Sequence, residues 1–292
     1  MANANACRQF HDVHSKKGST QAMAARRRWL HRVMTTLLTL VLCYAALIGA
    51  LYAMQESLLF YPEKLPRDYR FNIPGAVEVK IPVDGAELSA LHLRLPNPRG
   101  LVFFLHGNAG SLRLWFSNSE FYRRANYDLF MIDYRGFGKS TGSIESEAQL
   151  EADVRKAWDF VAPGYAGGKI IIYGRSVGTG LAVRLAGEVD ASLLVLVSPY
   201  TSVLDLTRRY YPFVPGLLLK YPLRSDLLLP RIRMPVLLIH GTRDEVIPYS
   251  HSVALKALAP GAELVPIEGA HHNDIHEFPA YLDLLADRLQ RL

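Results

Sequence analysis

The strongest constraint on the fold is a series of apolar runs, most of them followed by a glycine-containing turn and a helical stretch. The runs are LVFFLHG (101–107), YDLFMIDYRG (127–136), KIIIYG (169–174), LLVLVSP (193–199), PVLLIHG (235–241) and ELVPIEG (263–269). Runs that are apolar on both faces are typical of strands covered on both sides by helices, as in a parallel sheet built from βαβ units. Two earlier segments, 77–83 and 87–95, alternate partly and predict half-buried strands at the edge of this sheet.

The segments between these runs have helical spacing. In 146–161 (SEAQLEADVRKAWDFV), Leu150, Val154, Trp158 and Val161 fall on one stripe. No internal repeat and no low-complexity linker separates the runs from one another. The sequence therefore predicts one α/β domain over residues 55–292, with a mostly parallel central sheet flanked by helices.

An uncharged stretch of 22 residues, 33–54, precedes this domain. As a helix it would be roughly 33 Å long, close to the hydrocarbon thickness of a bilayer. Trp29 and Tyr52 lie near its ends, where amphipathic rings favour the membrane interface. A cleaved signal peptide is the main alternative, but the run is longer than a usual signal core and lacks a good small-x-small cleavage site. We expect a transmembrane anchor over 33–54.

The net charge of +6 belongs to the N-terminal tail. Residues 1–32 carry seven bases and one acid, and the 26 bases and 26 acids of the remainder cancel. The body therefore has no overall attraction for nucleic acids. A basic flank before an apolar segment predicts a cytoplasmic tail, with the domain at 55–292 on the far side of the membrane, the periplasmic or extracellular face in a bacterium. The two cysteines, Cys7 and Cys43, precede the domain, so no disulfide is expected inside it.

The run at 169–174 leads directly into GRSVG (174–178) and then into a stretch of small, helix-compatible residues. This is G-x-S-x-G in the strand–turn–helix setting that the motif requires, with Ser176 at the apex of the turn. The alternative, an ordinary glycine-rich turn, fits this setting less well. We expect Ser176 to be a nucleophile.

Serine is a weak nucleophile that needs a base, and the base needs a carboxylate to orient it. The run at 235–241 is followed by Asp244, and the run at 263–269 is followed by His271 and His272. The chain order Ser, Asp, His is the one expected in this setting. Adjacent side chains point in different directions, so only one of the two histidines can face Ser176. Glu245 and Asp205 are weaker candidates for the acid.

An oxyanion hole is expected where the run at 101–107 opens into a small-residue loop. The backbone amide of Asn108 can turn towards the nucleophile there, beside the amide of Val177. We expect His106 to shape this loop rather than to act as a base.

Together these elements resemble the α/β-hydrolase superfamily, and within it the membrane-associated subgroup that includes protein depalmitoylases, lipases and proteins labelled serine aminopeptidases. The resemblance lies in HGNAG (106–110), DYRGFGKS (133–140), GRSVG (174–178), HGTRDEVIP (240–248) and GAHHND (269–274). It runs in order from about residue 101 to the C-terminus. It implies that His272, which precedes Asn-Asp, is the catalytic histidine, although His271 stands where the subgroup usually has a small residue. It also implies an α/β-hydrolase fold, here with only a short cap at about 200–230.

Two other site chemistries fail on their motifs. Gly138, Lys139 and Ser140 follow a strand as in a phosphate-binding loop, but the required upstream glycine is Asp133. His272 and His276 are one helical turn apart, yet there is no HExxH motif and no evident third metal ligand. We therefore expect neither a metal nor a cofactor.

The expected function is a serine hydrolase that cleaves an acyl ester or thioester, with a lipid or another acylated molecule as substrate. Ser176, His272 and Asp244 would form the catalytic triad, and the amides of Asn108 and Val177 the oxyanion hole. A serine peptidase with the same triad is one alternative. A catalytically inactive, membrane-tethered binding module is the other. The bilayer is the only further partner expected, and the sequence leaves the oligomeric state open.

Overall fold

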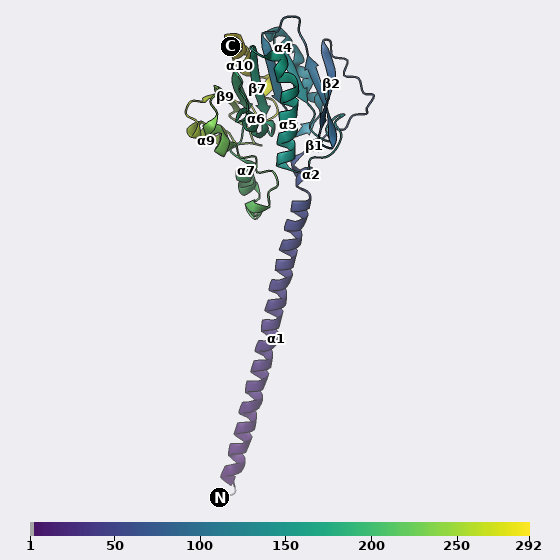
Figure 1. The fold of residues 1–292 in the computed structure, drawn as a ribbon. Coiled ribbons are helices and arrows are strands. Elements are labelled where there is room, and N and C mark those ends of the chain that lie inside the picture. Colours follow the sequence, from purple (N-terminus) through teal and green to yellow (C-terminus); the bar gives the residue numbers. More distant parts are fainter. Residues whose placement is uncertain (1–2) are drawn as a thin grey trace. The chain divides into compact units, whose positions relative to one another are not determined.

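The computed structural model describes residues 3–292, with side chains from Met23 onwards. The chain divides into two units, residues 1–54 and 55–292 (Figure 1).

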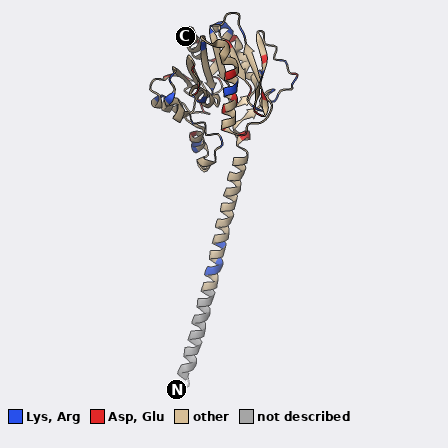
Figure 2. Cartoon of the chain, in the orientation of Figure 1, with Lys and Arg blue, Asp and Glu red and all other residues tan. Residues whose placement is uncertain are grey.

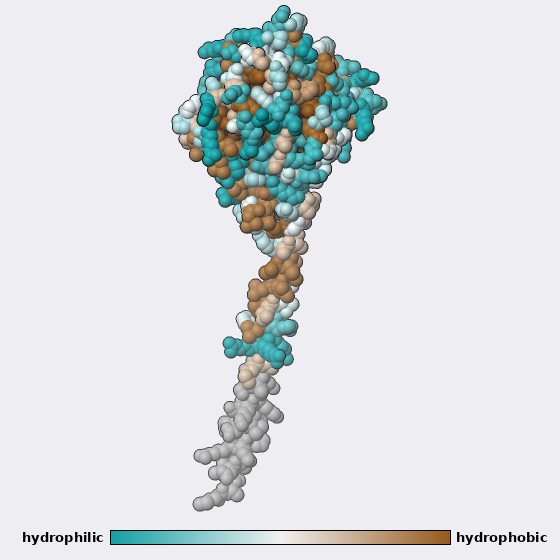
Figure 3. Space-filling view, in the orientation of Figure 1, coloured by the Kyte–Doolittle hydropathy of each residue, from teal (hydrophilic) through white to brown (hydrophobic). Residues whose placement is uncertain are grey.

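The N-terminal unit is a single helix, α1 (Asn3–Ala53). Its part from Met23 to Ala53 contains an 18-residue stretch with a mean hydropathy of 2.1 and is long and apolar enough to cross a membrane. Figure 2 shows the arginines of this part as a blue cluster, and Figure 3 shows the apolar band that follows it. The helix is continuous across the predicted boundary between tail and anchor. Of the predicted basic tail, residues 1–2 and the side chains of 3–22 lie outside the described part of the chain.

The second unit is built on an eight-stranded sheet in the order β10-β9-β8-β7-β4-β6-β3-β2. The strands are β2 (Ala76–Val83), β3 (Ala86–Leu93), β4 (Gly100–Leu105), β6 (Asp128–Ile132), β7 (Lys169–Arg175), β8 (Leu193–Val197), β9 (Val236–Gly241) and β10 (Glu263–Ile267). The six strands from β10 to β6 are parallel, and β3 is antiparallel to both of its neighbours. This is the mostly parallel sheet that the apolar runs predict.

The burial of two strands differs from expectation. β3 was expected to be half-buried at the edge, but its residues from Leu88 to Leu93 are buried because β2 and β6 flank it on both sides. β10 was expected to be buried on both faces, but it forms the opposite edge of the sheet and is partly exposed. A further short pair, β1 (Tyr61–Pro62) with β5 (Ala109–Gly110), was not predicted from the sequence.

Helices cover both faces of the sheet, as Figure 1 shows. The longer helices are α4 (Ser119–Ala125), α5 (Glu147–Val161), α6 (Gly178–Ala186), α9 (Ser250–Leu258) and α10 (Pro279–Arg291). Alternate side chains of β4 enter two separate hydrophobic clusters, with Phe103 in the cluster that includes α5 and α6, and Phe104 in the one that includes α4 and α10. The apolar stripe predicted for α5 is buried, and Ser146 caps that helix by accepting a hydrogen bond from the Gln149 amide.

Short helices fill the remaining connections. They are α2 (Gln55–Leu59), α3 (Leu112–Trp115), α7 (Val203–Tyr210), α8 (Ser225–Leu228) and five 3₁₀ turns, η1 (Phe116–Asn118), η2 (Ala162–Tyr165), η3 (Gly216–Leu218), η4 (Leu229–Arg231) and η5 (Ile275–Glu277). In the predicted cap, Tyr200 is buried in the core. Tyr210, Tyr211, Phe213 and Leu217 are exposed, so these four do not serve to fill the core.

Candidate active site

Ser176 lies in a strained turn between β7 and α6. Its φ is +53°, in the left-handed region that side chains other than glycine seldom occupy, and the residue is buried. The turn is possible because Gly178 lacks a side chain: a Cβ there would lie 2.2 Å from the carbonyl oxygen of Leu105 at the end of β4. The serine is therefore held close against the ends of β7 and β4, as expected of a nucleophile turn.

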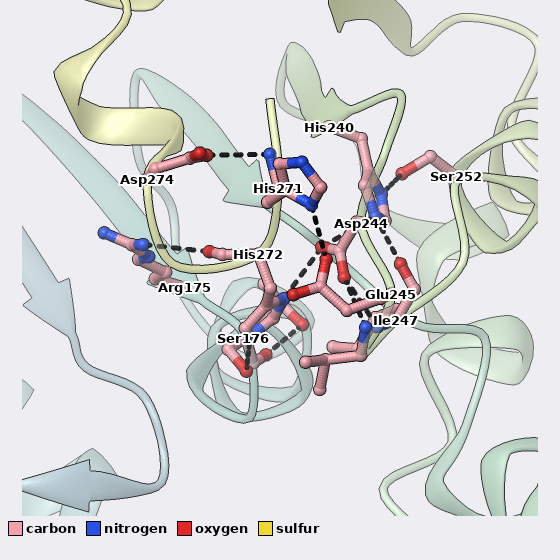
Figure 4. A network of polar contacts seen from close by, with 12 residues as sticks. Arg175, Ser176, His240, Asp244, Glu245, Ile247, Ser252, His271, His272 and Asp274 are labelled. Atoms are coloured by element: carbon pink, nitrogen blue, oxygen red, sulfur yellow. Dashed lines mark hydrogen bonds and ion pairs between the residues drawn. The ribbon is translucent and has the colours of Figure 1, made fainter. Parts of the chain in front are cut away.

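The structure brings Ser176, His272 and Asp244 into one hydrogen-bonded chain (Figure 4). Nε2 of His272 lies 3.0 Å from Oγ of Ser176, and its Nδ1 lies 2.7 Å from Oδ2 of Asp244. The three residues follow β7, β10 and β9, whose carboxyl ends meet at one edge of the parallel sheet. When Nδ1 carries the proton and donates it to the carboxylate, Nε2 is free to accept the proton of the serine hydroxyl.

Asp244 is held as a carboxylate by the groups around it. Its Oδ1 accepts hydrogen bonds from the amides of Val246 and Ile247, at 3.0 and 2.7 Å. Burial alone would raise the pKa of Asp244, but hydrogen bonds from His240 and His272 outweigh burial, and the pKa lies well below its usual value. Asp244 is therefore charged throughout the pH range in which most proteins stay folded.

His240 is a site residue to which the sequence analysis assigned no role. Its Nε2 lies 2.8 Å from the Ile247 carbonyl oxygen and 3.2 Å from Oδ2 of Asp244, and its Nδ1 lies 2.6 Å from Oγ of Ser252. The imidazole is completely buried. It fixes the loop after β9 and contributes to the charge state of Asp244. Two sequence features indicate it, its position near the end of the apolar run 235–241 and its place at the start of HGTRDEVIP (240–248).

The alternative candidates lie elsewhere. Nδ1 of His271 is 3.0 Å from Oε2 of Glu245, and both side chains are exposed. Asp205 accepts a hydrogen bond from the hydroxyl of Thr201 at 2.8 Å. Of the described residues, His272 and Asp244 are those that reach Ser176 and one another, so the geometry selects them over His271, Glu245 and Asp205.

The loop after β4 passes directly beside Ser176. A Cβ on Gly107 would lie 3.6 Å from Cβ of Ser176, so the backbone that leads into Asn108 is next to the nucleophile. The amide of Val177 belongs to the residue that directly follows Ser176, at the start of α6. The carbonyl of Asn108 accepts a hydrogen bond from the amide of Tyr61 at 2.8 Å, which ties this loop to β1.

His106 is buried below the same loop. Its Nδ1 lies 2.7 Å from the carbonyl oxygen of Gly107, and burial lowers its pKa to about 4. The hydroxyl of Tyr134 donates a hydrogen bond to the backbone carbonyl of His106 at 2.9 Å. These contacts agree with the expectation that His106 shapes the loop. Among the described residues, no group of three or more His, Cys, Asp or Glu side chains is placed to hold a metal ion.

Three comparisons identify relatives. A sequence model of the family described as "Serine aminopeptidase, S33" matches residues 96–225. Alpha/beta hydrolase domain-containing protein 17C of Xenopus tropicalis is 38% identical over 213 residues, which cover 69% of this chain and 65% of that protein. Protein 17B of the same species is 35% identical over 213 residues, covering 69% of this chain and 70% of that protein. The chain thus spans just under two thirds of the first of these relatives.

The fold is also found among solved structures. The Pyrococcus furiosus esterase Pf2001 superimposes with a TM-score of 0.64 at 22% identity, covering 80% of this chain and 97% of that one. At this identity the likeness concerns the fold alone. With the parallel sheet, the strained serine turn and the matching relatives, these findings show that the chain belongs to the α/β-hydrolase superfamily.

Proposed function

We propose that this protein is a serine hydrolase that cleaves a carboxylic ester or thioester through an acyl-enzyme formed on Ser176. The observation that carries the proposal is the continuous hydrogen-bonded chain from Ser176 through His272 to Asp244, with the serine at the apex of a left-handed turn. A serine that only stabilised a loop would need neither a buried imidazole at its hydroxyl nor a buried carboxylate behind that imidazole.

The proposed reaction has two stages. Oγ of Ser176 attacks the substrate carbonyl carbon while its proton moves to Nε2 of His272. His272 then gives this proton to the leaving oxygen or sulfur, and the acyl group stays on Ser176. A water molecule next transfers a proton to His272 and attacks the acyl carbon. The bond to Oγ breaks, Ser176 regains its proton and a carboxylic acid is released.

Asp244 acts through His272 in this scheme. Its negative charge stabilises the imidazolium that forms in each stage, and the hydrogen bond at 2.7 Å fixes the ring in the orientation that proton transfer requires. The contacts from His240 and from the amides of Val246 and Ile247 support this role because they keep Asp244 ionised.

We assign the oxyanion hole to the backbone amides of Asn108 and Val177. The close approach of Gly107 to Ser176 supports the first assignment, and the position of Val177 at the start of α6 supports the second. A well-placed donor contributes about 3 kcal/mol to the stability of the transition state.

We further propose that residues 33–54 anchor the chain in a bilayer. The length and hydropathy of α1 between Met23 and Ala53 support this, and the arginines at 26–28 and 32 favour a cytoplasmic N-terminus with the catalytic domain across the membrane. An active site attached to a membrane favours lipid esters or other acylated molecules as substrates.

A peptidase is the second candidate, favoured by the description of the matching family model as a serine aminopeptidase. The same triad can cleave an amide. The experiment is a series of p-nitrophenyl esters and acyl thioesters of increasing chain length, run beside an aminoacyl-nitroanilide, with full-length protein in detergent. Ester or thioester turnover that Ser176→Ala abolishes supports the proposal. Turnover of the nitroanilide alone favours the peptidase, and no turnover of any substrate by folded protein favours the inactive binding module.

A further inference from the structure

Arg175, which directly precedes Ser176, contacts the loop that carries His272. Its Nη2 donates a hydrogen bond to the backbone carbonyl oxygen of His272 at 3.1 Å, as Figure 4 shows. Its Nη1 lies 3.4 Å from Nδ1 of His276. The guanidinium therefore reaches from the nucleophile turn at the end of β7 to the backbone of the histidine loop after β10. The proposed reaction of Ser176, His272 and Asp244 makes no use of this contact.

The same guanidinium lies over an aromatic ring. Cζ of Arg175 is 5.4 Å from the ring centre of Trp115, a cation–π distance. Trp115 is the last residue of α3, a short helix that follows the loop after β4. The guanidinium thus donates to the His272 loop and contacts a ring on α3.

Trp115 in turn holds the loop that contains Asn108. Its indole N–H donates a hydrogen bond to the carbonyl oxygen of Ala109 at 2.7 Å. Its ring also packs on Gly107, where a Cβ would lie 2.9 Å from the indole. A side chain at Gly107 would displace the loop, and the Asn108 amide that lies between Gly107 and Ala109 would move with it.

We propose that Arg175 and Trp115 form a positioning pair that keeps the His272 loop and the Asn108 loop in register with Ser176. The contacts form one line, from the Ala109 carbonyl through the indole and the guanidinium to the His272 carbonyl. Arg175 and His272 are 97 residues apart in the sequence, and Trp115 lies on a separate helix, α3, so no local backbone structure holds the three segments together. Neither residue reaches the reacting atoms, so both act through the groups they hold. This inference rests on the proposed function.

Arginine suits this place better than lysine. Its planar group can donate to the carbonyl of His272 while it lies over the indole, whereas an ammonium is a point charge on a flexible stem. Arg175→Lys, which keeps the charge, should therefore lose less activity than Arg175→Met, which keeps only the aliphatic stem.

The test compares Arg175→Met, Arg175→Lys and Trp115→Phe, the last of which keeps a ring but removes the indole N–H. Arg155→Met is the matched control, because Arg155 lies on α5 and pairs with Asp159 at the surface. Each variant is assayed with the best ester, its kcat and KM are determined separately, and its thermal midpoint is measured.

A displacement of about 1 Å in a catalytic group costs about 100-fold in rate. We expect Arg175→Met to lose about that much kcat with KM changed less than about threefold, Arg175→Lys and Trp115→Phe to lose roughly tenfold, and Arg155→Met to stay at the wild-type value.

The double variant Arg175→Met/Trp115→Phe tests whether the two residues act together. If they form one unit, the double variant is about as slow as Arg175→Met alone, since loss of the guanidinium already disconnects Trp115 from the His272 loop. Three results overturn the proposal. The first is a double variant whose loss of kcat equals the product of the two single losses, and the second is a wild-type kcat in Arg175→Met. The third is a loss of kcat that is fully explained by a lower thermal midpoint. A wild-type protein with no turnover at all overturns the proposed function, and the positioning role with it. If Ser176→Ala abolishes turnover and Arg175→Met keeps the wild-type kcat, the proposed function stands and only the positioning role fails.

Discussion

Nδ1 of His272 lies 2.7 Å from Oδ2 of Asp244 in the buried site, and the two residues next to them, His271 and Glu245, form a second contact of 3.0 Å at the surface. The loops after β9 and β10 therefore meet through two successive imidazole–carboxylate contacts. Only the inner contact continues to Ser176. This difference in position allows the inner and the outer pair to be tested against one another.

Asp244→Asn should leave the fold intact and lower kcat by about 10⁴-fold, because an amide does not stabilise the imidazolium and favours the wrong tautomer of His272. Glu245→Gln is the matched control and should stay within a few-fold of wild type, since its side chain is exposed. Steady-state kinetics with the best ester measure both. Near-normal turnover of Asp244→Asn would move the acid role to Glu245 or Asp205.

The two histidines should respond differently to the same change. His272→Ala removes the group that accepts the serine proton and should abolish turnover to the level of Ser176→Ala. His271→Ala removes an exposed contact and should change kcat less than about threefold. Equal losses in the two variants, measured at equal folded protein concentration, would contradict the assignment of His272.

The buried carboxyl of Asp133 should make the stability of the folded protein depend on pH. Burial raises the pKa of this carboxyl from 3.8 to about 8, although the Leu112 amide donates a hydrogen bond to Oδ1 at 2.9 Å. The folded state then holds a proton that the unfolded chain releases above 3.8. The contribution of Asp133 to stability is complete below that value and is lost as the pH rises towards about 8.

Asp133→Asn cannot ionise and should lack this dependence. The thermal midpoint of wild type minus that of Asp133→Asn should fall from pH 5 to pH 8. Melts of both proteins in the same detergent measure it, with Asp159→Asn as a control substitution at an exposed position. A difference that stays flat or grows with pH would show that the carboxyl is ionised in the folded protein.

The topology of the chain can be tested with fusions at the C-terminus. Because the arginines precede the apolar stretch of α1, alkaline phosphatase fused after Leu292 should be active on the far side of the membrane. A fusion in which the four residues Arg26, Arg27, Arg28 and Arg32 are changed to Glu should lose this preference. A phosphatase that is inactive in the wild-type fusion, beside a fluorescent cytoplasmic reporter, would reverse the proposed orientation.

Much of the fold follows from local patterns, because strands buried on both faces must be apolar throughout and amphipathic helices must carry a stripe. All eight strands of the main sheet were predicted on these grounds, as was the buried stripe of α5. The burial predicted for β3 and β10 was wrong, because burial depends on which strand lies at the edge of the sheet. No local pattern reports that order.

The candidate site was predictable in part. Ser176 follows from its motif, while the preference for His272 over His271 needed the family resemblance, because adjacent residues cannot be distinguished by spacing. His240, Arg175 and Trp115 were not assigned roles. Each works through a contact with a backbone carbonyl, that of Ile247, His272 or Ala109, and no side-chain pattern in the sequence reports which carbonyl lies within reach in the folded chain.

The central claim is that Ser176 is a nucleophile activated by His272, and its most direct test is covalent capture. Full-length protein in detergent is treated with a fluorophosphonate, digested, and the adduct is located by mass spectrometry. The account predicts one adduct, on the peptide that contains Ser176, formed by wild type but not by Ser176→Ala, and formed at least about 100-fold more slowly by His272→Ala. An adduct on a different residue, or no adduct on folded wild-type protein, would contradict it.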